Sequence, residues 1–189
     1  MQENFSPQQS LQLIQAMIQK TRANMSENRF YFLLWGWLVF GSILCQIILK
    51  VVLDYRHHYI VWLLTIPAMF VTIYYSRKQG NRMVQTYVGE SMANLWIGVG
   101  ISFFVLVFII SAGIGWRNAW PFMILMYGLG TFISGRILQF KPFVVGGILN
   151  WLIACICVFL PYDYQMCGAA LAILTSYIIP AYMIHEKAN

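Results

Sequence analysis

Few residues in this sequence carry side chains suited to catalysis or metal binding. Asp54, His57 and His58 lie close together, and imidazole and carboxylate groups are good metal ligands. Two adjacent histidines without a second pair make a weak metal site, so we expect a solvated loop there. Metal binding or pH sensing is the alternative. No C-x-x-C pair occurs among the four cysteines, which we expect to serve helix packing: Cys45, Cys155, Cys157 and Cys167.

The sequence contains no signature of a known class of active site. It has no nucleophile elbow, no H-E-x-x-H motif and no phosphate-binding loop. Its long apolar stretches contain no histidine and no aspartate, which disfavours both an intramembrane hydrolase and a haem held by two histidines. We therefore predict a protein that is not an enzyme and has no cofactor and no resident metal.

Uncharged polar side chains interrupt the apolar stretches and are the remaining candidates for a functional site. We expect most of them to form hydrogen bonds between helices, and the alternative is a polar path through the protein. Glu90, at the start of one apolar stretch, suits the positive end of a helix dipole. The full candidate set is Gln46, Glu90, Asn94, Thr131, Ser134 and Asn150.

Composition indicates the environment in which these residues act. Hydrophobic residues make up 60% of the 189 residues and charged residues only 10%, whereas a soluble domain has about 25% charged residues. This composition excludes a soluble enzyme domain, a disordered chain and a small disulfide-bonded scaffold. It indicates a membrane protein.

The charges are confined to short clusters, and the stretches between them are long enough to cross a bilayer as helices. Because these stretches do not alternate strictly between polar and apolar residues, a β-barrel is disfavoured. We predict an all-α, polytopic membrane domain over residues 29–189, with six transmembrane helices arranged as three hairpins. The expected spans are residues 30–49, 59–75, 92–114, 119–135, 142–161 and 164–184.

Residues 1–28 form a separate element. Ser6, Pro7 and Gln9 are typical of a helix start, and Leu11 and Ile18 belong to an apolar stripe that faces away from polar residues. The sequence predicts an amphipathic cytoplasmic helix that lies on the bilayer or under the bundle. A dimer seam is the alternative, because the same stripe also fits heptad spacing.

The basic residues predict the orientation of the spans. With a cytoplasmic N-terminus, nine basic residues face the cytoplasm and three face outward, as the positive-inside rule requires. We therefore expect a multi-pass protein of the cell (inner) membrane with both termini cytoplasmic. The basic excess then needs no nucleic acid as a partner. Some basic residues are also candidates for contacts with anionic lipid headgroups: Arg77, Lys78, Arg82, Arg136 and Lys141.

Small residues at spacings of four indicate close helix packing, within one chain or across a homodimer. Gly98 and Ser102 have this spacing, and so do Gly130 and Ser134. Pro67 is expected in the middle of the second span, where it would kink the helix or act as a hinge. The glycines expected to serve packing are Gly98, Gly128, Gly130, Gly135, Gly146 and Gly147.

The segment from Gly128 to Gly147, with its Ser134-Gly135-Arg136 and Phe140-Lys141-Pro142 runs, resembles small six-span bacterial inner-membrane proteins of uncharacterised function. The resemblance covers the last four expected helices. It implies the six-span layout and no particular activity.

Two functions agree with these features. The first is a non-enzymatic accessory, sensor or stress-response module of the inner membrane. The second is a transporter or channel for a small neutral or weakly polar solute, acting as a homodimer.

Overall fold

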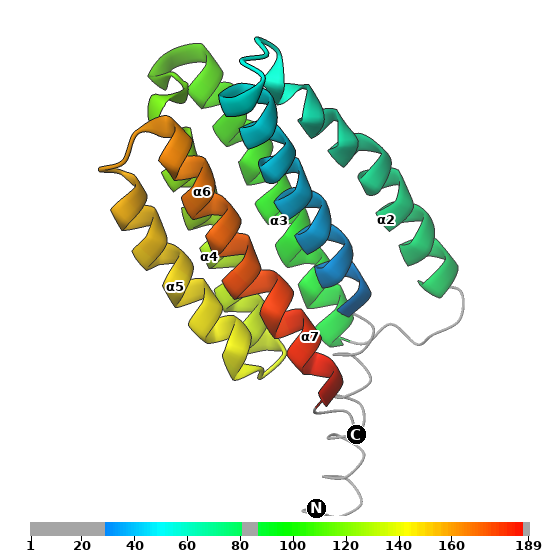
Figure 1. Cartoon of the computed structure of the whole chain (residues 1–189). Coiled ribbons are helices and arrows are strands. Elements are labelled where there is room, and N and C mark those ends of the chain that lie inside the picture. The colour runs from blue at the N-terminus through cyan, green and yellow to red at the C-terminus, as the bar shows by residue number, and fades with distance from the viewer. Residues whose placement is uncertain (1–28, 81–86, 187–189) are drawn as a thin grey trace, which may run out of the picture.

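The computed structural model describes residues 29–80 and 87–186, so the predicted helix over residues 1–28 lies outside the described residues. In these two ranges the chain forms a bundle of helices and contains no strand (Figure 1). The predicted all-α fold class is confirmed.

The bundle consists of helical rods that alternate in direction along the chain. The first rod comprises residues 29–47 and the π-helical turn Ile48–Val52, and the second comprises the 3-10 helix His58–Leu64 and α2, Thr65–Gly80. The third is α3, Tyr87–Ile109, with the π-helical turn Ile110–Ile114, and the fourth is the 3-10 turn Trp116–Asn118 with α4, Ala119–Ile137. The fifth is α5, Lys141–Cys157, and the last is α6, Tyr162–Ile173, which continues through the π-helical turn Leu174–Ile178 into α7, Ile179–Glu186. We refer to residues 29–52 as the first rod.

Four of these helices are long and apolar enough to cross a membrane: Arg29–Val52, His58–Lys78, Val88–Gly113 and Tyr162–Ile184. Lys141–Cys157 is apolar but has 17 residues, which extend over about 25 Å of a hydrocarbon core that is about 30 Å thick. The glycine-rich α4 is not among the four. The structure therefore supports a membrane protein, and the count of six spans stays a prediction.

The two ends of the bundle differ in chemistry. The described chain begins and ends at the same end, where α4 also connects to α5 (Figure 1). We call this the basic end, because Arg77, Lys78, Arg136 and Lys141 are exposed there. The opposite end, here the far end, contains the turn from the first rod to the second and the turns before α4 and α6.

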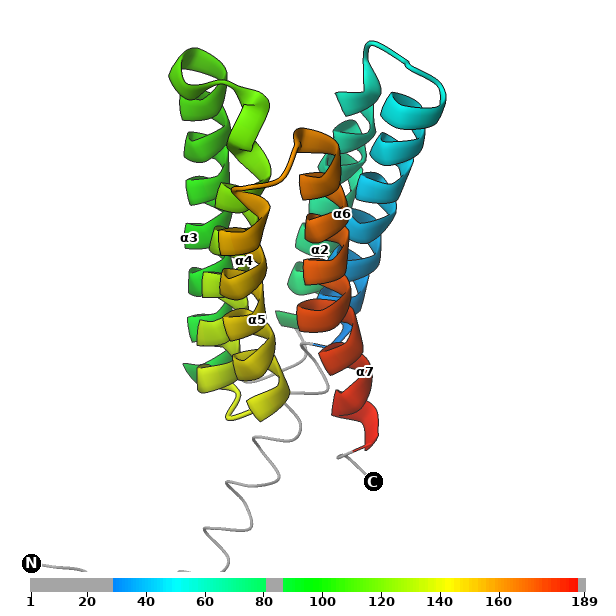
Figure 2. The ribbon, with the colours of Figure 1, turned by 60° about the vertical axis from the view of Figure 1, so that its left-hand side comes forward.

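The α4–α5 hairpin is the most closely packed helix pair of the described chain, and its two helices lie side by side (Figure 2). Its connection at the basic end is tight, because the Phe140 amide donates to the Gly135 carbonyl at 2.8 Å and Gln139 adopts φ 52°. Leu138, Phe140 and Phe143 are buried beneath this turn. Helices α3 and α6 pack against this hairpin.

Candidate functional site

A cluster of polar and aromatic side chains lies at the far end of the bundle. We call Gln46, Lys50, His58, Trp62 and Asp163 the far-end cluster. The first rod supplies two members, which lie four residues apart and therefore on one helix face. The others come from the 3-10 helix before α2 and from the first turn of α6, so the cluster joins three segments.

Gln46 is the centre of the far-end cluster. Its side chain is 2% exposed, so its amide needs hydrogen-bond partners inside the protein. The Trp62 indole N–H donates to Gln46 Oε1 at 2.7 Å, and Gln46 Nε2 lies 3.1 Å from His58 Nδ1. One amide therefore links the first rod to two positions at the start of the second.

An ion pair joins the first rod to the last helix. The Lys50 ammonium pairs with the Asp163 carboxylate and lies 4.3 Å from the centre of the Tyr162 ring. Both charged side chains are partly exposed, so the pair contributes little to stability by itself. Its role is positional, because it connects residues 113 positions apart in the sequence.

Aromatic rings extend the far-end cluster into the bundle. The Trp62 ring lies 6.0 Å from the Trp120 ring, which lies 6.5 Å from the Tyr162 ring. Nearby, Gln165 Nε2 donates to Asn118 Oδ1 at 3.2 Å and to the Leu160 carbonyl at 2.9 Å. Trp120 Nε1 and Gln165 Oε1 are buried and have no hydrogen-bond partner in the described part of the chain.

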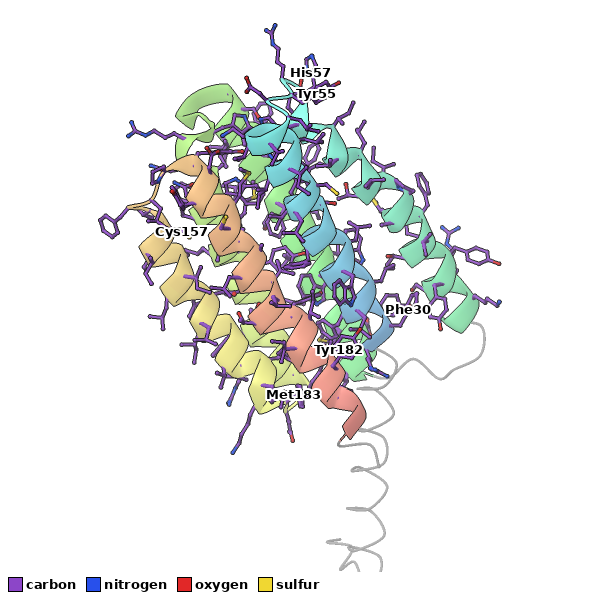
Figure 3. All side chains as sticks on the ribbon, in the orientation of Figure 1. Phe30, Tyr55, His57, Cys157, Tyr182 and Met183 are labelled. Carbon is purple, nitrogen blue, oxygen red and sulfur yellow. The ribbon has the colours of Figure 1, made fainter. Side chains whose placement is uncertain are left out.

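The two neighbouring histidines have different surroundings. His57 is exposed at the tip of the far-end loop, beside Tyr55, and its Nδ1 lies 2.8 Å from the Tyr59 hydroxyl (Figure 3). His58 is partly buried and contacts Gln46 instead. Asp54 lies in the same loop with φ 46°. Over residues 29–80 and 87–186, no three His, Cys, Asp or Glu side chains are placed to hold one metal ion.

The structure disperses the polar residues proposed for a path. Thr131 and Ser134 are buried in α4, where their hydroxyls donate to their own helix, to the Tyr127 carbonyl at 2.8 Å and the Gly130 carbonyl at 2.7 Å. Glu90 and Asn94 are exposed on α3. Gln46 belongs to the far-end cluster, so these residues do not converge on one site.

Asn150 is the exception among the buried polar groups. It is completely buried in α5, and its Cβ would lie 3.0 Å from a Cβ at Gly128. Neither its amide nitrogen nor its amide oxygen has a hydrogen-bond partner among the described residues. Leaving such a group unpaired costs about 1–3 kcal/mol, so this position requires an explanation.

A groove of about 310 Å³ lies between α3 and α4 and does not include any of the proposed path residues. Its walls are almost entirely apolar, so it is unsuited to polar solutes. The lining residues are Ile101, Ser102, Val105, Leu106, Ile109, Phe122, Leu125 and Met126.

Three glycines bring the backbones of α4 and α5 into contact. A Cβ on Gly135 would lie 2.6 Å from the Val144 nitrogen, and one on Gly147 would lie 2.8 Å from the Gly128 carbonyl oxygen. A Cβ on Gly128 would lie 2.8 Å from the Trp151 ring, which fixes Trp151 as a packing residue. Glycine is needed where two backbones approach this closely.

The other glycines named from the sequence divide into two groups. Gly130 packs against the Trp96 ring, and Gly146 packs against the Ser176 backbone, where a Cβ on Gly146 would lie 2.7 Å from Ser176 Cα. Gly168, which the spacing did not single out, packs against the Cys157 sulfur. Gly98 has open space around it in this chain, so close packing there stays a prediction about a second copy.

Pro67 lies near the start of α2, directly after the 3-10 helix His58–Leu64. Proline is well tolerated there, because the first residues of an α-helix have no intrahelical partner for their N–H groups. Pro67 also lies in the middle of the candidate span His58–Lys78, next to the change of helix type, and the kink stays a prediction. Of the five residues proposed to bind headgroups, Arg82 lies outside the described residues, and the other four are exposed at the basic end.

Comparisons with protein-family models, with curated proteins and with solved structures find no match to this chain. The functional conclusion therefore depends on the geometry above.

Proposed function

We propose that this protein is a non-enzymatic integral membrane protein that acts as an accessory, sensor or stress-response module. The observation that carries the proposal is how the polar side chains of the long helices are used. Gln46 joins helix ends, while Thr131, Ser134 and Ser176 bond to their own helices. The Gln46 bonds hold helices together and the hydroxyl bonds satisfy buried groups within one helix, so few of these groups are free to bind a solute.

The proposed location is the inner membrane, with six spans and both termini in the cytoplasm. Support comes from the exposed basic residues, most of which lie at the end where the described chain begins and ends, while Arg56 and Arg117 lie at the far end. Anionic lipid headgroups are the proposed partners of this end, and a homodimer is the proposed assembly. A periplasm-active reporter fused after Asn189 should stay silent, and its activity would contradict the orientation.

Transport of a small neutral solute is the second candidate function, and Asn150 is the observation that favours it. An unpaired amide at the centre of a bundle is suited to contact a passing polar molecule or a bound water. The other polar residues do not line up with it, which is why transport ranks second.

Flux through proteoliposomes separates the two functions. Vesicles containing the full chain should swell in glycerol or urea no faster than protein-free vesicles. The matched variant is Asn150→Leu, which removes the unpaired amide and keeps a similar side-chain volume. Flux that the protein accelerates and that Asn150→Leu abolishes would establish transport and overturn the module proposal.

A further inference from the structure

The contrast between His57 and His58 points to a proton-responsive contact. We propose that His58, Gln46 and Trp62 form a relay in which protonation of His58 breaks one of the two hydrogen bonds that join the start of the second rod to the first rod. This inference rests on the proposed role as a sensor, and it assigns the proton as the signal and the far side of the membrane as the side that is sensed.

The hydrogen bonds fix the protonation state of the relay. An indole N–H can only donate, so the atom of Gln46 that faces Trp62 must be the amide oxygen. The amide nitrogen of Gln46, which also only donates, then faces His58 Nδ1 at 3.1 Å. Nδ1 must accept this hydrogen bond, so His58 is neutral in this arrangement and carries its proton on Nε2.

Protonation of His58 breaks this arrangement whichever way the amide turns. A protonated imidazole donates from both nitrogens, so Nδ1 and the Gln46 nitrogen would become two donors facing each other. If the amide turns by 180°, its oxygen accepts from His58, but its nitrogen then faces the Trp62 N–H. One of the two hydrogen bonds must be lost in either case, which makes the relay a two-state element.

Burial and charge act on His58 in opposite directions. Partial burial of the ring opposes its protonation most, Lys50 also opposes it, and Asp163, which is paired with Lys50, favours it. The loop that contains His58 carries further titratable groups. The ring centre of Tyr59 lies 6.0 Å from that of His58, and Asp54, Arg56 and His57 are exposed. His58 itself is partly exposed, so protons reach it from the far end.

The loss of one hydrogen bond matters because α2 is weakly held. In the most apolar 18-residue stretch of His58–Lys78, only 6% of the residues are buried inside the protein, against 33% in the corresponding stretch of the first rod. Besides the two Gln46 bonds, the first rod holds the second through a Trp35–Thr72 hydrogen bond and a Phe30–Tyr75 ring contact. Losing one of the Gln46 bonds therefore loosens the far end of the second rod, and loss of the Trp62 bond also disturbs the contact between Trp62 and Trp120.

The test is an NMR pH titration of the full chain in nanodiscs of phosphatidylcholine. The indole N–H resonance of Trp62, assigned by its disappearance in Trp62→Phe, is followed from pH 8 to pH 5 together with the ring resonances of His58. Both should move through one transition with a common midpoint. The seven indole groups give internal references, and those remote from the cluster should not move.

Three variants test the mechanism. His58→Asn keeps an acceptor near the position of Nδ1 but cannot titrate, so it should abolish the Trp62 transition. The matched control is His57→Asn, which removes the neighbouring imidazole and should leave the transition in place. Gln46→Glu supplies a carboxylate that accepts from both partners, so it should raise the midpoint by about one pH unit or more.

Three results would overturn the relay: a Trp62 resonance that does not move while His58 titrates, a transition that survives in His58→Asn, or a midpoint that Gln46→Glu leaves unchanged or lowers. The wild-type titration already decides the first point, and it needs only the Trp62→Phe variant, which assigns the resonance. If the protein accelerates solute flux while Trp62 and His58 titrate together as expected, only the module function is overturned. A failed titration without flux would overturn the relay alone.

Discussion

Two hairpins of this bundle hold their helices together in opposite ways. In the α4–α5 hairpin, glycines bring the backbones into direct contact, and a Cβ at Gly135 or Gly147 would come within 2.9 Å of the facing helix. In the hairpin formed by the first rod and α2, long side chains span the gap. Gly36 of the first rod packs against Tyr177 and Ile178 of the last helix, away from α2.

The difference separates a fixed part of the molecule from a part that can move. Backbone contact has a single solution, because each helix fills the groove of the other and close-packed interiors do not deform continuously. Side-chain hydrogen bonds can be made and broken one at a time, each with a modest net energy. The α4–α5 hairpin therefore serves as the reference frame, and α2 as the element whose attachment is adjustable.

The largest expected effect is from a methyl group in the α4–α5 contact. In Gly147→Ala the new Cβ would lie 2.7 Å from Phe132 Cβ, so one helix must shift, at an expected cost of about 1–3 kcal/mol. The measurement is the free energy of unfolding in mixed micelles as the SDS fraction rises. Gly98→Ala is the control and should not destabilise the protein, because its Cβ meets open space. Equal losses in both variants would contradict the contrast between the hairpins.

A smaller effect is expected from the middle attachment of α2. Thr72→Val removes the acceptor of the Trp35 indole N–H, which should cost about 0.5–1.5 kcal/mol. Amide hydrogen exchange should then rise in α2 and stay unchanged in α4 and α5. Thr175→Val is the matched control, because the Thr175 hydroxyl bonds to its own helix at the Leu171 carbonyl. Faster exchange throughout the bundle would show that α2 is not an independent element.

The smallest effect is expected from the ion pair at the far end. Asp163→Asn removes the partner of Lys50, and because both groups are partly exposed the loss should be about 0.2–1 kcal/mol. The difference from the wild type should shrink as salt is raised from low to high concentration, since exposed charges are screened. A loss that salt does not change would mean that the pair is shielded from solvent and more important than its exposure indicates.

The sequence predicts the helices better than it predicts their partners. Charge-free stretches locate the rods, because a buried charge is costly and most rods end near a charge cluster, although α5 ends at Cys157 within a charge-free stretch. The small-residue spacing in α4 predicts close packing, yet it does not reveal that Gly147 meets Gly128 or that Gly146 meets Ser176. Those pairings depend on how one helix is rotated and shifted against another.

The far-end cluster was predictable in part. Asp54, His57 and His58 stand out in the sequence, and Gln46 stands out as a polar residue in an apolar stretch. What brings His58 to Gln46 is the shape of the intervening turn, where a π-helical turn ends the first rod and Asp54 adopts a positive φ. The Lys50–Asp163 pair joins segments far apart in the chain, so local spacing contains no sign of it.

The π-helical turn Leu174–Ile178 sets the register of everything that follows it in the last helix. An α-helix advances about 100° per residue, so it cannot easily bury three neighbours in a row, yet Ser176, Tyr177 and Ile178 are all buried here. The wider turn inserts one residue and still returns Ala181 and Ile184 to the core. Deleting a single residue from this turn would restore an ordinary α-helix and keep Ala181 and Ile184 directed inward, at the loss of one of the three consecutive buried side chains. The last helix should therefore tolerate the loss of one residue at this turn better than elsewhere, where the same loss would rotate the segment that follows by about 100°.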